Sequence, residues 1–94
     1  MQDKQRQNDY YWKAVESGDS QLVVDSLNVA KYGDLAADVN LRREDEWTTL
    51  HVAASEGHYY VTKVLIEHNA EIDALTTSHR TPLHIACIRY ASSY

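Results

Sequence analysis

Histidine and cysteine are the side chains of this protein best suited to metal binding or nucleophilic catalysis. Their densest group is His79, His84 and Cys87. His84 and Cys87 are three residues apart, which places both on one face of a helix, as in a zinc-binding pair. No fourth ligand is evident, and neither an oxyanion hole nor a third orienting group for a cysteine–histidine nucleophile is recognisable. We therefore expect no metal site, no cofactor and no catalytic residue.

Composition and charge exclude several other classes of function. Of the 94 residues, 44% are hydrophobic and 24% charged, which is typical of a folded domain rather than a disordered segment. The net charge is -5 and the nine basic residues are scattered, so a surface for nucleic acid or anionic membrane is not expected. No apolar run approaches the length of a membrane span, and the lone cysteine permits no internal disulfide. These features predict an intracellular, cytoplasmic module of a single domain.

A repeat of 33 residues organises the elements that must position these side chains. Shifting the sequence by this period aligns residues 48–53 (TTLHVA) with residues 81–86 (TPLHIA), giving four identities in six positions. Each segment opens with a threonine suited to capping a helix, and Pro82 suits the first helical position. Apolar spacing marks one buried face after each cap, and residues 61–66 supply the apolar stripe of a second helix. Each repeat is therefore predicted to be a pair of helices.

These segments resemble a known family. Residues 81–86 match T-P-L-H-x-A, the signature of the 33-residue ankyrin repeat, in full, whereas residues 48–53 depart from it by Thr49 in place of proline. Asn69 stands where that family usually has glycine, and asparagine is the best other residue for a left-handed helix end. The chain thus resembles ankyrin-repeat proteins over residues 39–87. The resemblance implies an all-α ankyrin-repeat solenoid of stacked antiparallel helix pairs, joined by β-hairpin-like turns.

About two and a half repeats are expected within one domain spanning residues 1–94. Residues 10–40 are interpreted as a divergent N-terminal capping repeat with about six extra residues, residues 41–73 as a complete repeat, and residues 74–94 as a truncated third. No second helix follows in the third repeat. We therefore expect further ankyrin repeats or a partner subunit to cover that C-terminal end.

The resemblance also assigns structural roles to residues that could otherwise be taken for chemistry. In ankyrin proteins the signature histidines, here His51 and His84, brace the turn through hydrogen bonds. Cys87 takes the place of Ala54, a buried packing position where a free cysteine behaves as a small hydrophobe.

By the same resemblance, the chain is expected to be a non-catalytic protein–protein interaction module. Ankyrin proteins commonly contact partners through the hairpin tips and the concave face of each first helix. The positions that match are Glu44, Asp45, Trp47, Ser55, Glu56, Thr77, Ser78, Arg80, Ile88 and Arg89, with Glu16 and Ser17 as weaker candidates. The acidic run at residues 44–46 favours a partner protein with a basic patch.

Several alternatives stay open at this point. Trp47 is either a projecting interface anchor or a residue packed against the adjacent hairpin, for example beneath a stacked Arg80. The whole chain is alternatively a structural subunit or fragment of a larger array that docks through its open end, residues 83–94. A third hypothesis makes it a regulatory module of an enzyme or channel that is not present in this chain.

Overall fold

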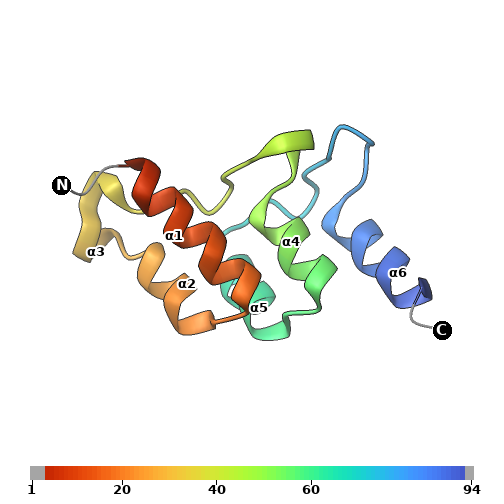
Figure 1. Cartoon of the computed structure of the whole chain (residues 1–94), viewed down its shortest axis with the longest axis horizontal. Coiled ribbons are helices and arrows are strands. Elements are labelled where there is room, and N and C mark those ends of the chain that lie inside the picture. Colours follow the sequence, from red (N-terminus) through yellow and green to blue (C-terminus); the bar gives the residue numbers. More distant parts are fainter. Residues whose placement is uncertain (1–3, 93–94) are drawn as a thin grey trace.

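Helices in two layers make up this protein (Figure 1). The computed structural model describes residues 4–92. The inner layer consists of α1 (Lys4–Ser17), α4 (Thr49–Glu56) and α6 (Pro82–Ser92), and the outer layer of α2 (Ser20–Ser26) and α5 (Tyr59–Glu67). Neighbouring inner helices contact each other, and α2 and α5 contact both each other and their own inner helices. The molecule is elongated, at 45 × 25 × 20 Å, and the expected all-α solenoid of stacked helix pairs is confirmed.

The first helix pair is followed by a longer connection than the second. Asp19 begins α2, because its carboxylate accepts hydrogen bonds from the backbone N–H groups of Gln21 and Leu22. After α2 the chain forms α3 (Val29–Tyr32) and the 3₁₀ helix η1 (Gly33–Leu35). Both short helices lie within residues 10–40, the repeat for which the sequence predicts about six extra residues.

Local sequence signals set the ends of the second helix pair. Thr48 caps α4 by accepting a hydrogen bond from the His51 N–H, and the His51 ring accepts one from the Thr48 N–H. Gly57, with φ of 71°, ends α4 in the left-handed conformation. Asn69 follows α5 with φ of 68°, so the predicted left-handed asparagine is confirmed.

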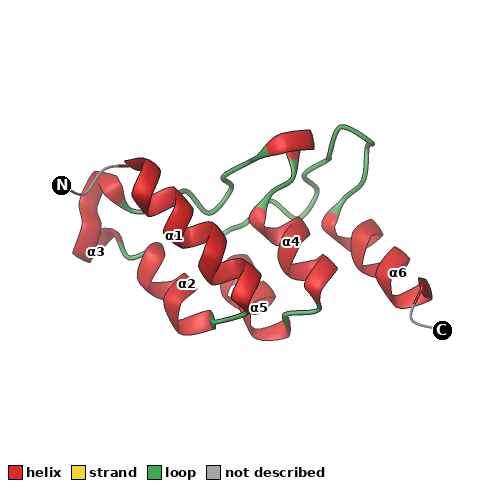
Figure 2. Cartoon of the chain, viewed as in Figure 1, coloured by secondary structure: helices red, strands yellow, loops and turns green. Residues whose placement is uncertain are grey.

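Two long turns project from the same edge of the inner layer (Figure 2). The first carries the 3₁₀ helix η2 (Glu44–Glu46) and closes through an antiparallel bridge between Arg42 and Thr48. The second closes where the Thr76 N–H donates to the Arg80 carbonyl at 3.0 Å, and the Thr77 N–H donates to the Asp45 carbonyl at 2.9 Å. The two turns are thus hairpin-like and joined to each other.

The hydrophobic core lies between the first two repeats. Its fully buried members come from α1, α2, α4 and α5 and include Tyr11, Val15, Val23, Val61 and Leu65. No helix within residues 4–92 is both long enough and apolar enough to cross a membrane.

One face of α6 is uncovered, which corrects the expectation for Cys87. Cys87 is exposed, although its equivalent Ala54 is partly covered because α6 packs on α4. Within the described residues no outer helix packs on α6, so Leu83 remains 71% exposed. The buried role expected of Cys87 would require a further element on this face.

Candidate partner-binding surface

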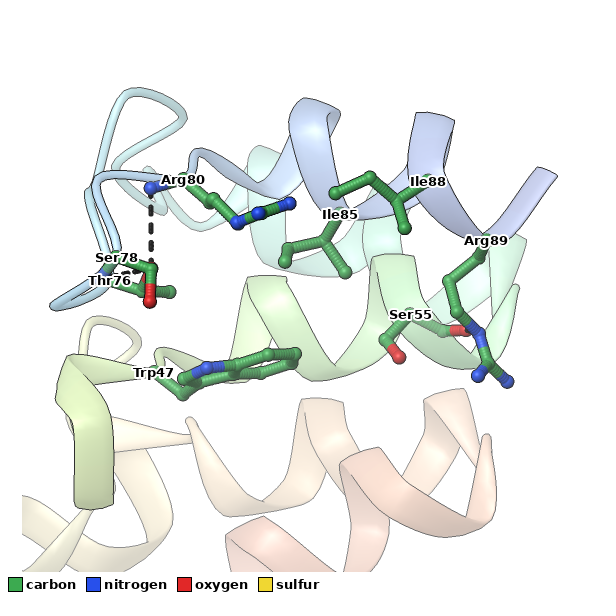
Figure 3. Close-up of a pocket in the computed structure, with 8 residues that line it drawn as sticks. All are labelled: Trp47, Ser55, Thr76, Ser78, Arg80, Ile85, Ile88 and Arg89. Carbon is green, nitrogen blue, oxygen red and sulfur yellow. Dashed lines mark hydrogen bonds between the residues drawn. The ribbon is translucent and has the colours of Figure 1, made fainter. Parts of the chain in front are cut away.

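Six of the ten predicted binding residues line one open pocket of about 380 Å³ between α4, α6 and the two turns (Figure 3). We call it the inner-helix pocket, and its lining residues are Trp47, Ser55, Thr76, Ser78, Arg80, Ile85, Ile88 and Arg89. The helix stack therefore brings together side chains from two stretches of the sequence, residues 47–55 and residues 76–89.

Trp47 forms part of the floor of this pocket and is half-buried. It packs against the hydrophobic core, with its ring centroid 5.6 Å from that of His51. The expected stacking of Arg80 on Trp47 is not seen within the described residues. Instead, Arg43 stacks on Trp12, with its guanidinium 4.6 Å from the centre of the Trp12 ring. Trp47 is thus a packed residue whose remaining surface faces the pocket.

Arg80 is held by its backbone, which leaves its side chain to extend along the pocket (Figure 3). Its N–H donates to Thr76 Oγ1 at 3.2 Å, and its carbonyl accepts from the Thr76 N–H at 3.0 Å. Thr76 Oγ1 also accepts from the Ser78 N–H at 3.2 Å, which forms a side-chain turn. Thr76 was not among the predicted residues, although a threonine two residues before a serine in a polar turn is a recognisable signal for this motif.

His51 connects the pocket to the cap of α4. Its Nδ1 accepts hydrogen bonds from the Thr48 N–H at 3.1 Å and the Thr48 hydroxyl at 2.8 Å. Its Nε2 therefore carries the proton and donates to the Arg80 carbonyl at 2.8 Å. Burial of the ring lowers the pKa of His51 below its usual value. The bracing role implied by the resemblance is confirmed for this histidine.

The helix α6 supplies the apolar wall of the pocket and one of its two arginines. Ile85 is buried and Ile88 is 42% exposed. The Arg89 Nε donates to the Ser55 carbonyl at 3.0 Å, which ties α6 to α4 across the pocket. Ile85 was not among the predicted residues either, although it precedes Ile88 by three residues and so lies on the same helix face.

The remaining predicted residues lie elsewhere. Glu44 and Asp45 line a second hollow with Arg43, and this hollow shares Trp47 with the inner-helix pocket. Thr77 is exposed, and its N–H bonds to the carbonyl of Asp45, which lines the second hollow. Glu56 is exposed at the end of α4 and lines neither hollow. The weaker candidates Glu16 and Ser17 are exposed at the end of α1, where the Glu16 carboxylate lies 3.6 Å from an Arg43 nitrogen.

The candidate metal ligands do lie close together in space. His79, His84 and Cys87 line a shallow pocket on the uncovered side of α6. However, His84 Nδ1 accepts from the Thr81 N–H at 3.1 Å, so this nitrogen is engaged in the cap of α6. Within residues 4–92, no group of three or more histidine, cysteine or acidic side chains is arranged to hold a metal ion.

Comparisons with known proteins agree with the helix-pair architecture. Residues 12–93 match the family model for ankyrin repeats in three copies. The chain is 43% identical to the NF-kappa-B inhibitor cactus of Drosophila melanogaster over 62 residues, which cover 65% of this chain and 12% of that protein. It is 37% identical to the potassium channel AKT1 of Oryza sativa subsp. indica over 73 residues, which cover 78% of this chain and 7% of the channel. It is 50% identical to the ankyrin repeat domain-containing protein 49 of Bos taurus over 41 residues, which cover 44% of this chain and 17% of that relative.

Proposed function

The chain belongs to the ankyrin-repeat family, and from this premise we propose that it is a non-catalytic module that binds a partner protein through the inner-helix pocket and the adjoining hairpin tips. The observation that carries the proposal is the convergence of two turns and two inner helices on one pocket. The pocket combines a tryptophan ring, two isoleucines, three hydroxyl side chains and two arginines. Aromatic residues and arginine are enriched at protein–protein interfaces, so this composition supports partner binding.

Preorganisation supports this role. The Arg80 backbone is held by Thr76 and His51, and the first turn is tied to the second by the bond between Thr77 and Asp45. A partner therefore meets turns that are already ordered, and little conformational entropy is lost on binding. We further propose that the exposed acidic run at residues 44–46 selects partners with basic groups beside the pocket, mainly through the association rate.

The relatives limit what can be carried over to this chain. It spans between 7% and 17% of the length of the three relatives described above. One is named as an inhibitor and another as a potassium channel, so the shared part corresponds to a module and not to either activity. A binding module that serves different host proteins is consistent with this distribution. A regulatory role within a longer enzyme or channel is one form that the proposed function could take.

The uncovered face of α6 favours a second candidate function, in which the chain docks through its open end. Exposed Leu83 lies beside an apolar groove that also includes Leu50, Ala54, Thr62, Ile66, Ile72, Pro82 and Ala86. Groups of exposed apolar side chains of this kind mark interaction sites. In this alternative, further repeats or a partner subunit cover the groove.

Affinity capture from a native lysate tests both proposals. The baits are the wild-type chain, Ile88→Glu in the inner-helix pocket, Leu83→Asp in the groove, and Tyr60→Glu as a control on the exposed outer surface of α5. Ile88 is preferred to Trp47 as the test position because Trp47 packs against the core, so its truncation would also destabilise the fold. Circular dichroism confirms that each bait is folded.

We expect captured proteins to be lost with Ile88→Glu and retained with the other two variants. Loss with a folded Leu83→Asp and retention with Ile88→Glu would instead establish docking through the open end. Retention of the same proteins by all variants would contradict both proposals.

A further inference from the structure

We propose that the inner-helix pocket takes a partner segment in which an aspartate or glutamate lies beside an apolar side chain, and that Arg80 pairs with its carboxylate. The inference rests on the proposed function and specifies the chemistry of the partner.

The charges that line the pocket are all positive. The lining includes Arg80 and Arg89 and no aspartate or glutamate. Among the residues that the structure describes, no carboxylate lies within ion-pair distance of Arg80, whereas Arg42 pairs with Glu46 and Glu71, and Arg43 pairs with Glu16. Arg80 therefore has a guanidinium group available for a ligand. Its planar fork is suited to bidentate recognition of a carboxylate.

The rest of the pocket is suited to an apolar side chain. Trp47, Ile85 and Ile88 supply its apolar surface, and the Arg80 side chain extends along the same hollow (Figure 3). A volume of about 380 Å³ is near the lower end of the ~300–1,000 Å³ typical of ligand pockets, which suits one or two side chains of a peptide. A carboxylate bound here would sit beside apolar walls, where charge-assisted hydrogen bonds are stronger than in water.

The acidic character of the whole chain does not oppose this preference. The net charge is -5, and residues 44–46 carry three carboxylates at the tip of the first turn. None of these carboxylates lines the inner-helix pocket, whose charged lining residues are Arg80 and Arg89, so these arginines are the charges that a ligand in the pocket contacts. Basic groups elsewhere in a partner would still meet the acidic tip.

A phage-displayed library of random twelve-residue peptides, selected on the immobilised full chain, provides the test. We expect enriched peptides to share an aspartate or glutamate next to a large apolar residue. The best peptide is then synthesised with its acidic residue intact and with that residue changed to its amide. Both forms are titrated against the wild-type chain, Arg80→Gln and Arg80→Lys. Since the hydrogen bonds to Arg80 come from its backbone, these variants should fold, and thermal unfolding checks this.

The amide peptide should bind the wild-type chain at least about tenfold more weakly, because a charge-assisted pair is lost. Arg80→Gln should weaken the acidic peptide equally and abolish its advantage over the amide peptide. Arg80→Lys should restore part of that advantage, because it keeps the charge without the fork. Enriched peptides without an acidic preference, or an advantage that survives Arg80→Gln, would refute this inference and leave the proposed function standing. Failure to enrich any peptide would contradict the proposed function as well.

Discussion

At the scale of single residues, the two signature histidines provide an internal comparison. Both accept a hydrogen bond from the threonine that caps their helix, but only His51 is buried and also bonds to the next turn, at the Arg80 carbonyl. His51→Ala would leave the Thr48 N–H and the Arg80 carbonyl without this partner. We expect it to lower the free energy of unfolding by about 2–4 kcal/mol, as measured by urea denaturation.

His84→Ala is the matched control. It removes the same local cap from an exposed site, so we expect a loss of no more than about 1 kcal/mol. Equal losses at the two positions would show that the cap alone matters, and that the bond between the repeats contributes nothing measurable.

The lowered pKa of His51 makes stability depend on pH. Its ring is buried in the neutral form, and Nδ1 must stay unprotonated to accept from Thr48. The unfolded chain takes up a proton near the ordinary pKa of 6.5, while the folded chain resists doing so until a lower pH. The stability contributed by His51 is therefore present above pH 6.5 and is lost as the pH falls through that value, by up to about 1.4 kcal/mol per pH unit.

This prediction is checked with His51→Gln, which cannot titrate. The stability advantage of the wild-type chain over this variant should be largest at pH 8 and should shrink on acidification to pH 5. The other four histidines are present in both chains, so their effects cancel in the difference. An advantage that grows on acidification would mean that the folded chain binds this proton more readily than the unfolded chain, contrary to the expected sign.

Tyr11 explains why the second repeat tolerates threonine where proline is usual. The Tyr11 hydroxyl lies 2.8 Å from Thr49 Oγ1 and donates to the Val39 carbonyl at 3.0 Å, which ties α1 to the start of α4. With Tyr11 donating to Val39, the Thr49 hydroxyl is the donor in its bond to Tyr11. Tyr11→Phe should cost about 1 kcal/mol of unfolding free energy, because Thr49 Oγ1, 3.1 Å from the Val39 carbonyl, can then donate to that carbonyl instead. Tyr10→Phe should change stability by less than about 0.5 kcal/mol, since Tyr10 is 37% exposed and its hydroxyl lies 3.4 Å from Asp25. A double-mutant cycle of Tyr11→Phe with Thr49→Val measures the coupling energy between the two hydroxyls. A coupling energy near zero would argue against the hydrogen bond between Tyr11 and Thr49.

At the scale of elements, two glycines that end inner helices differ in what surrounds them. Gly18 and Gly57 both adopt positive φ, of 78° and 71°. A Cβ at Gly18 would lie 2.7 Å from the ring of His58, whereas a Cβ at Gly57 would meet nothing within 4 Å. Gly57→Ala should therefore cost only the strain of a left-handed residue, about 1–2 kcal/mol. Gly18→Ala should cost more, because the His58 ring must also move.

His58→Ala provides the control for that difference. The His58 Nε2 lies 3.0 Å from the Glu16 carbonyl, so this ring packs the start of the second outer helix against the end of α1. In a chain that already carries His58→Ala, the additional cost of Gly18→Ala should fall to that of Gly57→Ala in thermal unfolding. A cost that stays high would mean that the backbone of α1, and not the ring, resists the substitution.

The elements that could be predicted from the sequence depend on local interactions. The Thr48 cap and the left-handed Asn69 follow from neighbours within a few positions, and the 33-residue period supplies the stacking order. The environments of Trp47 and Cys87 could not be predicted in the same way, because they depend on segments far away in the sequence. Trp47 packs against a core to which α1, α2, α4 and α5 all contribute, and Cys87 is exposed because no described element covers it. The family pattern supplied six of the residues that line the inner-helix pocket, whereas Thr76 and Ile85 were not among the predicted binding residues.

At the scale of the whole molecule, the stack is asymmetric. In the first two repeats an outer helix covers the inner one, but within residues 4–92 no outer helix packs on α6. The apolar groove beside Leu83 lies where the repeat geometry would place that missing helix. Replacing residues 90–94 with a copy of residues 57–73 supplies it in register, because position 90 aligns with Gly57. We expect the extended chain to gain about 2–4 kcal/mol of unfolding free energy from apolar burial, and to unfold on the order of 10 °C higher.

A matched extension separates apolar burial from added length. In it, the copies of Val61, Val64 and Leu65 become serine, so the helix has the same length without the side chains that bury α5 against its neighbours. Calorimetry of both extensions should show a higher midpoint and a larger heat-capacity change of unfolding for the apolar one, because more apolar surface is exposed when it unfolds. Equal midpoints would mean that the groove does not accept a helix in the register of the repeat. The open end would then be a solvent-exposed face, and docking through it would lose its structural support, whereas binding through the inner-helix pocket would be unaffected.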